Sequence, residues 1–328
     1  METVNMHNLT TEVTRIGIGT WAIGGWMWGG TDEKESIKTI RNAFDLGLNL
    51  IDTAPVYGFG TSEKIVGKAI KEQGNREDIV LVTKVGLDWK GQQPFRNSSK
   101  ERIEKEINDS LQRLDTDYID VYMIHWPDPA VPFEETAETM QKLVDQGKIK
   151  SIAVSNYSPV QMDQFRKVAP VHVCEPPYNL FEREIEEDIL PYCQQNDIRT
   201  LTYGALCRGM LSGKMRTDRK FEGDDLRKVD PKFKGNRFQQ YIQAAENLDQ
   251  FARDNYGKNV RDLAVRWILD QGADIALWGL RKPDQLEGIE DVFGWHLDPD
   301  ALVEIDKIIT KYVKDPVGPE FMAPPKNS

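Results

Sequence analysis

Polar side chains directly follow three apolar runs of strand length in the first half of the chain. Asp52, Lys84 and His125 each come at the end of such a run, which is the expected carboxyl end of a buried strand. Taken alone, each could be an ordinary surface residue after a strand. Tyr57, however, lies in the turn that follows Asp52, and the four residues together indicate a catalytic site.

A tyrosine, a lysine, an aspartate and a histidine suit reversible hydride transfer to a carbonyl, because the developing alkoxide must receive a proton. We expect Tyr57 to donate that proton, with the ammonium of Lys84 lowering the tyrosine pKa from ~10 towards neutrality. Lowering the tyrosine pKa by about 2 corresponds to roughly 2.7 kcal/mol of stabilisation of the ionised form, which one close charge can supply. Asp52 would keep Lys84 charged, and His125 would orient the carbonyl oxygen. The hydride itself must come from a cofactor.

These residues need a scaffold that brings several strand ends together, and the rest of the chain predicts one. Apolar runs alternate with amphipathic helical stretches, and about eight strands are expected, at residues 15–20, 49–52, 79–84, 119–125, 150–155, 171–175, 199–203 and 275–279. The clearest helical stretches are residues 61–74, 98–114, 133–147 and 185–195. This alternation implies a parallel sheet, and the number of units favours a closed (β/α)₈ TIM barrel over an open doubly wound sheet. Active sites in such barrels lie at the carboxyl ends of the strands.

Two segments break the alternation. Residues 214–240 are highly charged and lack helical or strand periodicity. We interpret them as a mobile loop that covers the cofactor, with a solvated insertion as the alternative. Residues 314–328 form a proline-rich C-terminal tail. All 328 residues are expected to form one domain, as barrels of this length commonly do.

The composition limits the classes of partner. A net charge of −11 disfavours nucleic acid and anionic membranes, because both require a large basic surface. The first residues lack a signal-peptide pattern, and no apolar stretch approaches the roughly 20 residues of a membrane span, so a cytoplasmic location is expected. Cys174, Cys193 and Cys207 are too widely spaced for a disulfide framework, and the histidines are too scattered for a zinc motif. We therefore expect reduced thiols, no metal, a small-molecule substrate, and a monomer or a weak homo-oligomer.

Ordered motifs along residues 15–293 make the interpretation more specific. They are GIGTW at 17–21, DTAPVYG at 52–58, Thr83-Lys84, YMIHWP at 122–127 and GKIKSIAVSN at 147–156, followed by YNLFER at 178–183 and RGMLSGK at 208–214. The series closely resembles the aldo-keto reductase family, and the last two motifs resemble its bacterial stress-type branch, which is similar to the potassium-channel β subunits. The resemblance implies the tetrad Asp52, Tyr57, Lys84 and His125, the same four residues that the strand pattern indicates.

The resemblance also implies NADPH or NADP⁺ as the cofactor. Ser155 and Asn156 would bind the nicotinamide carboxamide, or else cap the following helix, and Tyr203 would stack under the ring, or else be a core aromatic. Glu175 stands where similar family members usually carry glutamine, and an ionised glutamate can accept a hydrogen bond but cannot donate one. Further cofactor contacts are implied for Gly19, Thr20 and Trp21.

The phosphates of the cofactor are expected at two places. Backbone N–H groups and basic side chains for the pyrophosphate would come from Gly204, Leu206, Cys207, Arg208, Gly209, Leu211, Gly213, Lys214 and Arg216. The last strand ends near Gly279, and a helix that includes Gln285 is expected to follow it. The N-terminus of such a helix favours anions. The planar guanidinium of Arg281 suits a 2′-phosphate, so NADPH is preferred to NADH, with an ordinary surface arginine as the alternative.

Aromatic residues are assigned to the substrate side. Trp21, Trp26 and Trp126 are expected to line a cleft with Tyr57 and His125, with core packing as the alternative for each tryptophan. The pattern Gly17-x-Gly19-x-x-Ala22 superficially fits a dinucleotide-binding fingerprint, but the residues after it do not open the helix that the fingerprint requires. Flexibility of the loop before Thr31 is expected from Gly24, Gly25, Gly29 and Gly30.

The leading interpretation is an NADPH-dependent reductase of aldehydes, ketones or aldose-type sugars, with Tyr57 as the proton donor. Within the same chemistry, the alternative is a sugar or polyol dehydrogenase that works in the oxidative direction. Outside catalysis, the alternative is a binding module that senses the nicotinamide cofactor.

Overall fold

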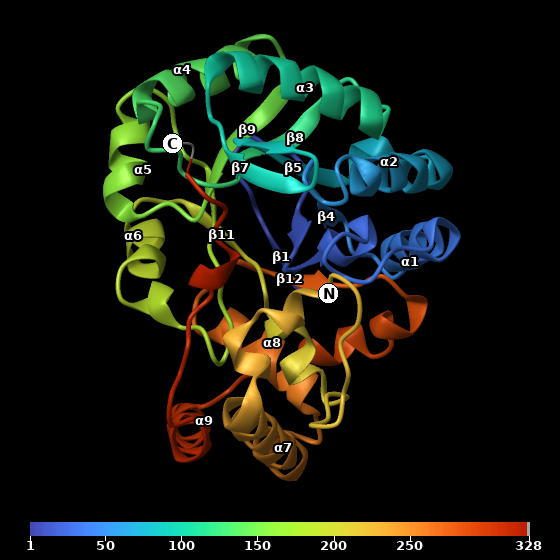
Figure 1. The fold of residues 1–328 in the computed structure, drawn as a ribbon, viewed down its shortest axis with the longest axis vertical. Helices are drawn as coiled ribbons and strands as arrows, with labels where there is room; N and C mark the ends of the chain where they lie inside the picture. Colours follow the sequence, from blue (N-terminus) through green and yellow to red (C-terminus); the bar gives the residue numbers. More distant parts are fainter. Residues whose placement is uncertain (327–328) are drawn as a thin grey trace.

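Eight parallel strands close into a barrel at the centre of the molecule (Figure 1). The computed structural model describes residues 1–326. Around the barrel, the order of the strands is β10, β11, β12, β3, β4, β5, β8 and β9. Their bounds are β3 Ile16–Gly19, β4 Leu50–Asp52, β5 Val80–Val85, β8 Ile119–Ile124, β9 Ile149–Ser155, β10 Val173–Glu175, β11 Arg199–Thr202 and β12 Ile275–Gly279. The predicted (β/α)₈ barrel is confirmed, and the open doubly wound sheet is excluded.

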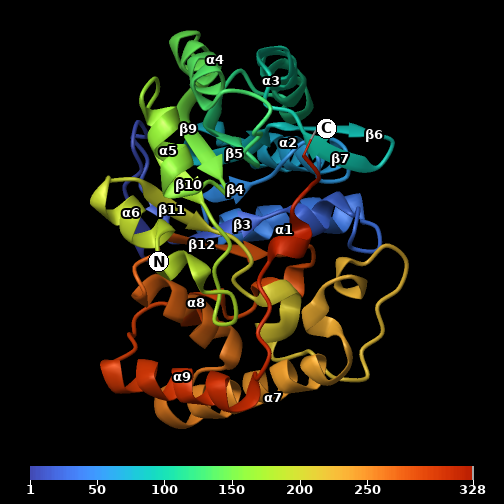
Figure 2. The same cartoon turned by 60° about the vertical axis from the view of Figure 1, so that its left-hand side comes forward.

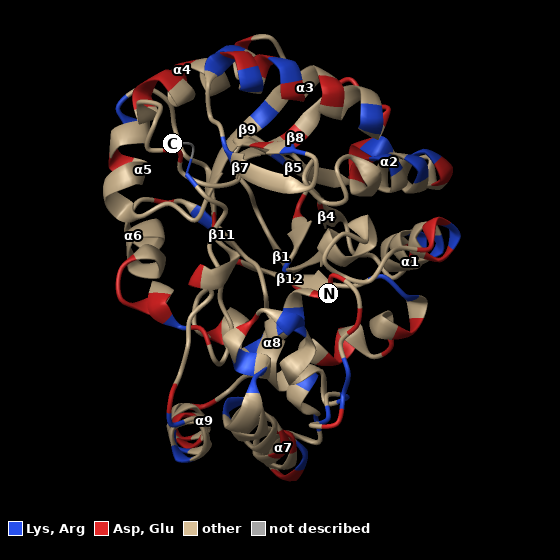
Figure 3. Cartoon of the chain, viewed as in Figure 1, with Lys and Arg blue, Asp and Glu red and all other residues tan. Residues whose placement is uncertain are grey.

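Helices surround the barrel on its outer side (Figures 1 and 2). Their bounds are α1 Glu33–Asp45, α2 Thr61–Gln73, α3 Lys100–Leu114, α4 Phe133–Asp145, α5 Pro159–Arg166, α6 Ile189–Gln195, α7 Gly235–Tyr256, α8 Val260–Asp270 and α9 Pro299–Tyr312. The stretch predicted at 185–195 divides into a 3₁₀ turn, Glu184–Glu186, and α6. Lysines, arginines and acids lie mainly on the helices and loops, whereas the barrel strands are largely free of charge (Figure 3).

Apolar side chains fill the inside of the barrel in addition to the space between strands and helices. The inner cluster includes Leu50, Val82, Met123 and Leu277, each 5% exposed or less. At the amino-terminal end of the barrel, the hairpin of β1 (Thr3–Val4) and β2 (Val13–Thr14) adds Val13 to the same cluster. Because side chains pack the interior, polar groups can gather only at the strand ends, as in other barrels of this type.

The charged segment predicted as a loop is shorter than expected. The helix α7 begins at Gly235, so only residues 214–234 lie outside regular helices, and two 3₁₀ turns, Leu226–Lys228 and Pro231–Phe233, occur within them. Phe238, Tyr241 and Ile242 are buried on one face of α7. They stand at i, i+3 and i+4, the spacing of an amphipathic helix, so the expectation that residues up to 240 lack helical periodicity is wrong for the last residues of the segment.

The helix expected after the last barrel strand does not form. A four-residue 3₁₀ turn, Pro283–Leu286, follows β12 instead, and a second such turn, Ile289–Val292, comes after Gly288, whose φ is +69°. This left-handed residue interrupts the helical path between the two turns. The four-residue turns after β12 offer no long helix N-terminus to an anion, so side chains must carry any phosphate recognition there.

The chain continues after α9 as a strap, defined here as residues 313–326, which runs from α9 to the hairpin of β6 (Leu87–Lys90) and β7 (Gln93–Arg96), as Figure 2 shows. Near its start, the amide of Val317 donates to the Tyr241 hydroxyl at 3.3 Å. Near its end, the amide of Arg96 donates to the carbonyl of Pro325 at 3.2 Å, and its Nε donates to the carbonyl of Pro324 at 3.1 Å. The proline-rich tail is thus bound to the body of the barrel at both ends. No helix in the described residues is long and apolar enough to cross a membrane.

Candidate active site

Neighbouring strands bring the four candidate catalytic residues to one end of the barrel. Asp52 is the last residue of β4, Lys84 is the penultimate residue of β5, and His125 directly follows β8. These strands pair in parallel, β4 with β5 and β5 with β8. Tyr57, in the turn after β4, packs edge-on against His125, with 5.7 Å between the ring centroids. The four residues therefore lie together at the carboxyl ends of the strands.

Lys84 lies at the centre of the polar group. Its ammonium donates a hydrogen bond to the Asp52 carboxylate and another, of 3.2 Å, to the carbonyl of Thr53. Lys84 Nζ also lies 3.5 Å from Oε2 of Glu175 and 5.3 Å from the centroid of the Tyr57 ring. The side chains of Asp52, Lys84 and Glu175 are at most 3% exposed. Water therefore screens their mutual attraction weakly.

The pKa of Tyr57 differs from the sequence-based expectation. Burial raises it above the ordinary value, the ammonium of Lys84 lowers it, and the charges of Asp52 and Glu175 raise it again. The expectation that Lys84 brings this pKa towards neutrality is wrong for this structure, because burial outweighs a single cation. Tyr57 consequently keeps its proton over the physiological pH range, which is the state that a proton donor requires.

Two neighbours of Tyr57, Lys84 and His125, differ in charge. Burial alone would lower the pKa of Lys84, but the acidic groups Asp52 and Glu175 raise it above the ordinary value, so Lys84 remains an ammonium. Burial and the charge of Lys84 both lower the pKa of His125 well below its usual range. His125 is therefore a neutral imidazole that can orient an oxygen atom through a hydrogen bond.

A close backbone contact fixes the turn that carries Tyr57. A Cβ atom added to Gly24 would lie 2.5 Å from the carbonyl carbon of Tyr57, and one added to Gly58 would lie 2.0 Å from the carbonyl oxygen of Gly24. Any side chain at either position would therefore push the two segments apart. Trp21, in the same 3₁₀ turn as Gly24, stacks on the Tyr57 ring with 6.0 Å between centroids and 24° between planes. Gly24 thus serves close packing, whereas a Cβ at Gly29 or Gly30 would meet open space.

Two cavities adjoin at Tyr57. The first, of about 260 Å³, is lined by all five residues predicted for the substrate cleft: Trp21, Trp26, Tyr57, His125 and Trp126. The second, of about 290 Å³, lies on the other side of Tyr57. The two cavities share as wall residues Trp21, Tyr57, Tyr203 and Met322. A molecule in one cavity can therefore reach a molecule in the other beside the Tyr57 side chain.

The wall of the first cavity includes a connected polar group. The hydroxyl of Tyr203 donates to Oδ1 of Asn156 at 2.9 Å, and Nδ2 of Asn156 donates to the carbonyl of His125 at 3.0 Å. Ser155 donates to the carbonyl of Glu175 at 2.7 Å. The residue that caps α5 is Ser158, so helix capping does not explain Ser155 and Asn156. Oε2 of Glu175 is buried and makes no hydrogen bond with any described residue.

Most of the residues predicted to bind the cofactor outside its nicotinamide carboxamide line the second cavity. Those that line it are Gly19, Thr20, Trp21, Tyr203, Gly204, Leu206, Arg208, Gly209, Gly279, Arg281 and Gln285. Gln285 accepts hydrogen bonds from the amides of Arg281 and Lys282, at 2.8 and 3.0 Å, and so holds the turn after β12. Nη1 of Arg281 donates to the carbonyl of Trp28 at 2.7 Å.

Five predicted cofactor residues do not line either cavity. Cys207 and Leu211 are fully buried in the core. Lys214 is exposed and faces Asp284 at 3.8 Å, and Gly213 and Arg216 line a separate hollow beside α7. The local sequence pattern, a glycine-rich loop followed by basic residues, does not indicate which of these side chains face inward.

Arg208 lines the second cavity and also belongs to a buried cluster of ion pairs. Its guanidinium lies 2.5 Å from Glu182 and 2.7 Å from Asp230, and both acids are fully buried. Lys232 joins the same cluster, 2.7 Å from Glu182, and donates to the carbonyl of Gly318 in the strap at 3.0 Å. This cluster ties the glycine-rich loop to the 214–234 segment and to the strap.

Several residues in the cavity walls were not predicted from the sequence. Arg219 and Arg227, from the 214–234 segment, line the second cavity, and Phe321, Met322 and Pro324 of the strap line the first. The charge of the 214–234 segment was a usable signal for the two arginines. Nothing local in the strap pointed to the cavity, because its position depends on distant partners.

The closed parallel barrel, with this polar group at its carboxyl end, has the architecture of a family of barrel oxidoreductases. Residues 15–310 match the aldo/keto reductase family model, and the chain belongs to this family, whose members use a nicotinamide cofactor. The chain is 60% identical to the aldo-keto reductase YhdN of Bacillus subtilis (strain 168), over 99% of this chain and 98% of the relative.

Two further comparisons differ in their described activities. The structure of the glycerol dehydrogenase AKR11B4 from Gluconobacter oxydans matches with a TM-score of 0.89 and 50% identity, over 98% of this chain and 99% of that one. The NADH-specific methylglyoxal reductase of Escherichia coli (strain K12) is 36% identical over 84% of this chain and 89% of its own length. Within the described residues, no group of three or more His, Cys, Asp or Glu side chains is arranged to hold a metal ion.

Proposed function

We propose that this protein is an NADPH-dependent carbonyl reductase, in which Tyr57 protonates the oxygen of an aldehyde, ketone or aldose-type substrate. The observation that carries the proposal is the position of Tyr57, in the wall shared by both cavities, with the Lys84–Asp52 ion pair behind it. A proton donor in this position faces a substrate in the first cavity and a cofactor in the second. The aromatic walls of the first cavity suit small carbonyl compounds.

The residues present fit a nicotinamide dinucleotide. Ser155 and Asn156 in the wall of the first cavity, and Tyr203 in the wall that both cavities share, offer polar groups for the nicotinamide end of the cofactor. Glu175 lines the first cavity beside them, and its buried Oε2 makes no hydrogen bond within the described residues. The second cavity adds arginines for phosphate groups and left-handed glycines at 204 and 209. When bound, the cofactor would supply the hydride, which no side chain can provide.

The side chains themselves supply the proton chemistry. Burial keeps the Tyr57 hydroxyl protonated, and Lys84 stabilises the tyrosinate that forms when the proton leaves. Asp52 holds the Lys84 ammonium in place. The neutral His125 orients the carbonyl oxygen towards Tyr57, and the strap residues Phe321 and Met322 help to exclude water from the first cavity. Turnover of a panel of carbonyl compounds, followed by NADPH absorbance, tests the proposal, and a single cofactor turnover without further reaction would favour a sensing module instead.

Arg281 is the residue proposed to bind the 2′-phosphate of NADPH. Replacing Arg281 with alanine is expected to lower the affinity for NADPH by about 10- to 150-fold, because a charge-assisted hydrogen bond is worth about 1.5–3 kcal/mol. The affinity for NADH should remain nearly unchanged. Fluorescence titrations with both cofactors measure the effect. Arg216→Ala is the matched control, since Arg216 lies outside the second cavity and should leave the NADPH to NADH ratio unchanged. Equal losses for both cofactors in Arg281→Ala would assign the 2′-phosphate to another residue, with Arg219 and Arg227 as candidates.

A second candidate function is a polyol dehydrogenase that works in the oxidative direction. The likeness to a glycerol dehydrogenase, with 50% identity, favours this alternative. The same side chains serve both directions, because the tyrosinate that forms in reduction is the base that oxidation needs. Initial rates with carbonyl and NADPH, compared with those for glycerol and NADP⁺ at the same pH, distinguish the two directions.

A further inference from the structure

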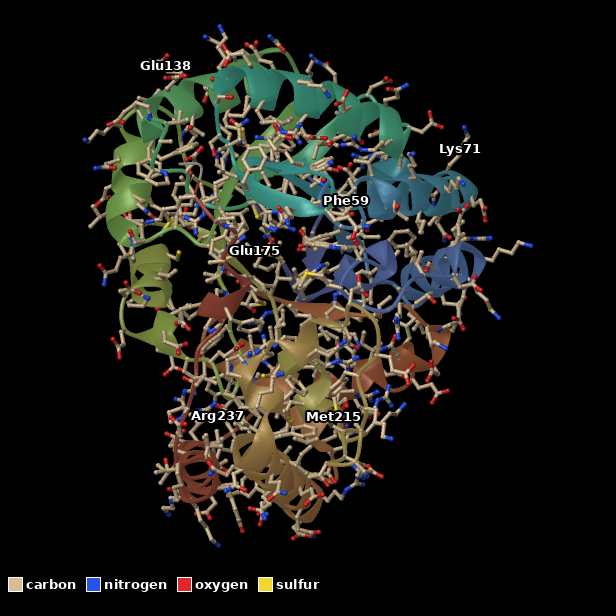
Figure 4. The ribbon with its side chains drawn as sticks, viewed as in Figure 1. Phe59, Lys71, Glu138, Glu175, Met215 and Arg237 are labelled. Atoms are coloured by element: carbon tan, nitrogen blue, oxygen red, sulfur yellow. The ribbon has the colours of Figure 1, made fainter. Side chains whose placement is uncertain are left out.

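Glu175 places a second carboxyl group against the ammonium of Lys84. It is the last residue of β10, is 2% exposed, and lies near the centre of the ribbon, whereas Lys71 and Glu138 lie at the periphery (Figure 4). Its Oε2 lies 3.5 Å from Lys84 Nζ, and Lys84 already forms a hydrogen-bonded pair with Asp52. Two buried carboxyl groups therefore face one buried cation.

The surroundings do not supply a second cation. In the part of the chain that the structure describes, Lys84 is the only cation that forms an ion pair with either carboxyl group. The other titratable groups near them are Tyr57, Tyr203, His125 and Cys174. Burial raises the pKa of the two tyrosines and lowers that of His125, and a hydrogen bond with Cys193 together with burial raises that of Cys174, so all four are uncharged at neutral pH. Two ionised carboxylates would leave an uncompensated buried negative charge, which is costly.

We propose that Asp52 and Glu175 together hold one proton at neutral pH, so that the group around Lys84 is electrically balanced and Glu175 is a neutral carboxylic acid. A protonated carboxyl group has one O–H donor in addition to its acceptor oxygens, so it regains the ability to donate that an amide has, with one hydrogen fewer. Oε2 of Glu175 makes no hydrogen bond within the described residues, although it lies 3.5 Å from the Lys84 ammonium, so a proton on this oxygen can be donated to a polar ligand group. The effect on turnover rests on the proposed function, but the proton itself is a property of the free protein.

The electrostatics agree with this geometry. Burial raises the pKa of Glu175 well above its usual range, and the charge of Asp52 raises it further against the opposing effect of Lys84. Burial also raises the pKa of Asp52, although Lys84 opposes the change. The two groups titrate as one unit, and the retained proton belongs to the pair.

The pair acts on the reaction through Tyr57. Negative charge on Asp52 or on Glu175 raises the pKa of Tyr57, because both oppose formation of the tyrosinate. A pair with one proton presents a single negative charge, which Lys84 matches. Glu175 is thus a positioning residue that sets the charge next to the proton donor.

The net charge of the folded protein tests the proposal directly. Wild type, Glu175→Gln and the control Glu138→Gln, an exposed residue of α4, are compared by native electrophoresis at pH 7. The control should shift by one charge, whereas Glu175→Gln should shift by less than half of that step, because a neutral acid is replaced by a neutral amide. A shift of half a step or more would overturn the proposal. If Glu175→Gln does not fold, Asp52→Asn serves instead with the same expectation, since the remaining carboxylate then ionises.

The pH dependence of stability gives a second, independent measurement. A carboxyl group with a raised folded pKa stabilises the protein fully below its unfolded value, near 4.5 for glutamate, and this stabilisation is lost as the pH rises towards the folded pKa. Glu175→Gln cannot lose a proton, so its Tm should rise relative to wild type as the pH increases from about 4.5 to neutrality. A Tm difference that does not vary with pH over this range would contradict the proposal.

The pH profile of turnover separates positioning from a general structural effect. At alkaline pH the wild-type pair loses its proton and adds a negative charge beside Tyr57, whereas Glu175→Gln does not. The alkaline limb for carbonyl reduction should therefore lie at lower pH in the variant, and a uniform loss of rate at every pH would exclude this role. The electrophoresis uses no substrate, so its result does not depend on whether the protein is a carbonyl reductase. Conversely, carbonyl turnover can be observed even if Glu175 is ionised.

Discussion

Replacing Tyr57 with phenylalanine is expected to lower the rate of carbonyl reduction by about 10²–10⁴-fold, the usual contribution of a positioned acid or base. The substitution removes the hydroxyl and keeps a ring of nearly the same shape, so the stacking on Trp21 and the contact with His125 should persist. Cofactor affinity should change little. Single-turnover measurements of NADPH oxidation report the chemical step and are the appropriate test.

Tyr122→Phe is the matched control for this experiment. Tyr122 is fully buried in β8, and its hydroxyl makes no hydrogen bond within the described residues, but it does not line either cavity. Its loss should leave the chemical step nearly unchanged. If Tyr57→Phe instead kept the wild-type rate in a step limited by chemistry, Tyr57 would not be the proton donor.

Replacing Arg208 with methionine is expected to lower the free energy of unfolding by about 3–5 kcal/mol, because breaking a buried ion pair leaves an uncompensated charge. Asp230 would lose the cation that lies 2.7 Å away, and Glu182 would keep only Lys232. Arg208 and Lys232 together hold the pKa of Glu182 below its ordinary value against the effect of burial. Glu182 would therefore become harder to keep ionised. Urea unfolding, with the midpoint and slope measured separately, quantifies the loss.

Arg216→Met controls for the loss of an arginine from the same region. Arg216 is exposed and donates to the carbonyls of Gly213 and Met215, so its replacement should change stability by no more than about 0.5 kcal/mol. Similar losses in the two variants would argue against a special role for the buried cluster. A change in NADPH affinity without a change in stability would return Arg208 to the direct phosphate contact that its sequence motif suggested.

The sequence predicted those features that depend on local patterns. The apolar runs before Asp52, Lys84 and His125 end where the barrel strands end, because burial on both faces of a parallel strand leaves a continuous apolar signature. Parallel pairing then brings those ends together without further information. Trp126 directly follows His125 after β8, so the same strand end accounts for its place at the barrel mouth.

The features that the sequence did not predict depend on distant partners. The side chain of Arg208 is turned inward by Glu182 and Asp230, which lie 26 and 22 residues away in the sequence. The 214–234 segment reaches the barrel mouth because the carboxylate of Asp224 accepts from the amide of Met27 at 2.7 Å and that of Gly29 at 3.3 Å. The effect of burial on Tyr57 was also hidden, because the sequence indicates the neighbouring charge but not the amount of water excluded.

The backbone contact between Gly24 and Tyr57 has a consequence for enzyme engineering. Libraries that aim to broaden the range of substrates would naturally vary the aromatic wall, including Trp21 and Trp26, on either side of Gly24. Even the methyl group of alanine at position 24 would have to displace the chain that carries the Tyr57 hydroxyl, and a misplacement of about 1 Å in a catalytic group can cost about 10²-fold in rate. Active variants selected on new substrates should therefore carry varied residues on both sides of position 24 but glycine at position 24 itself.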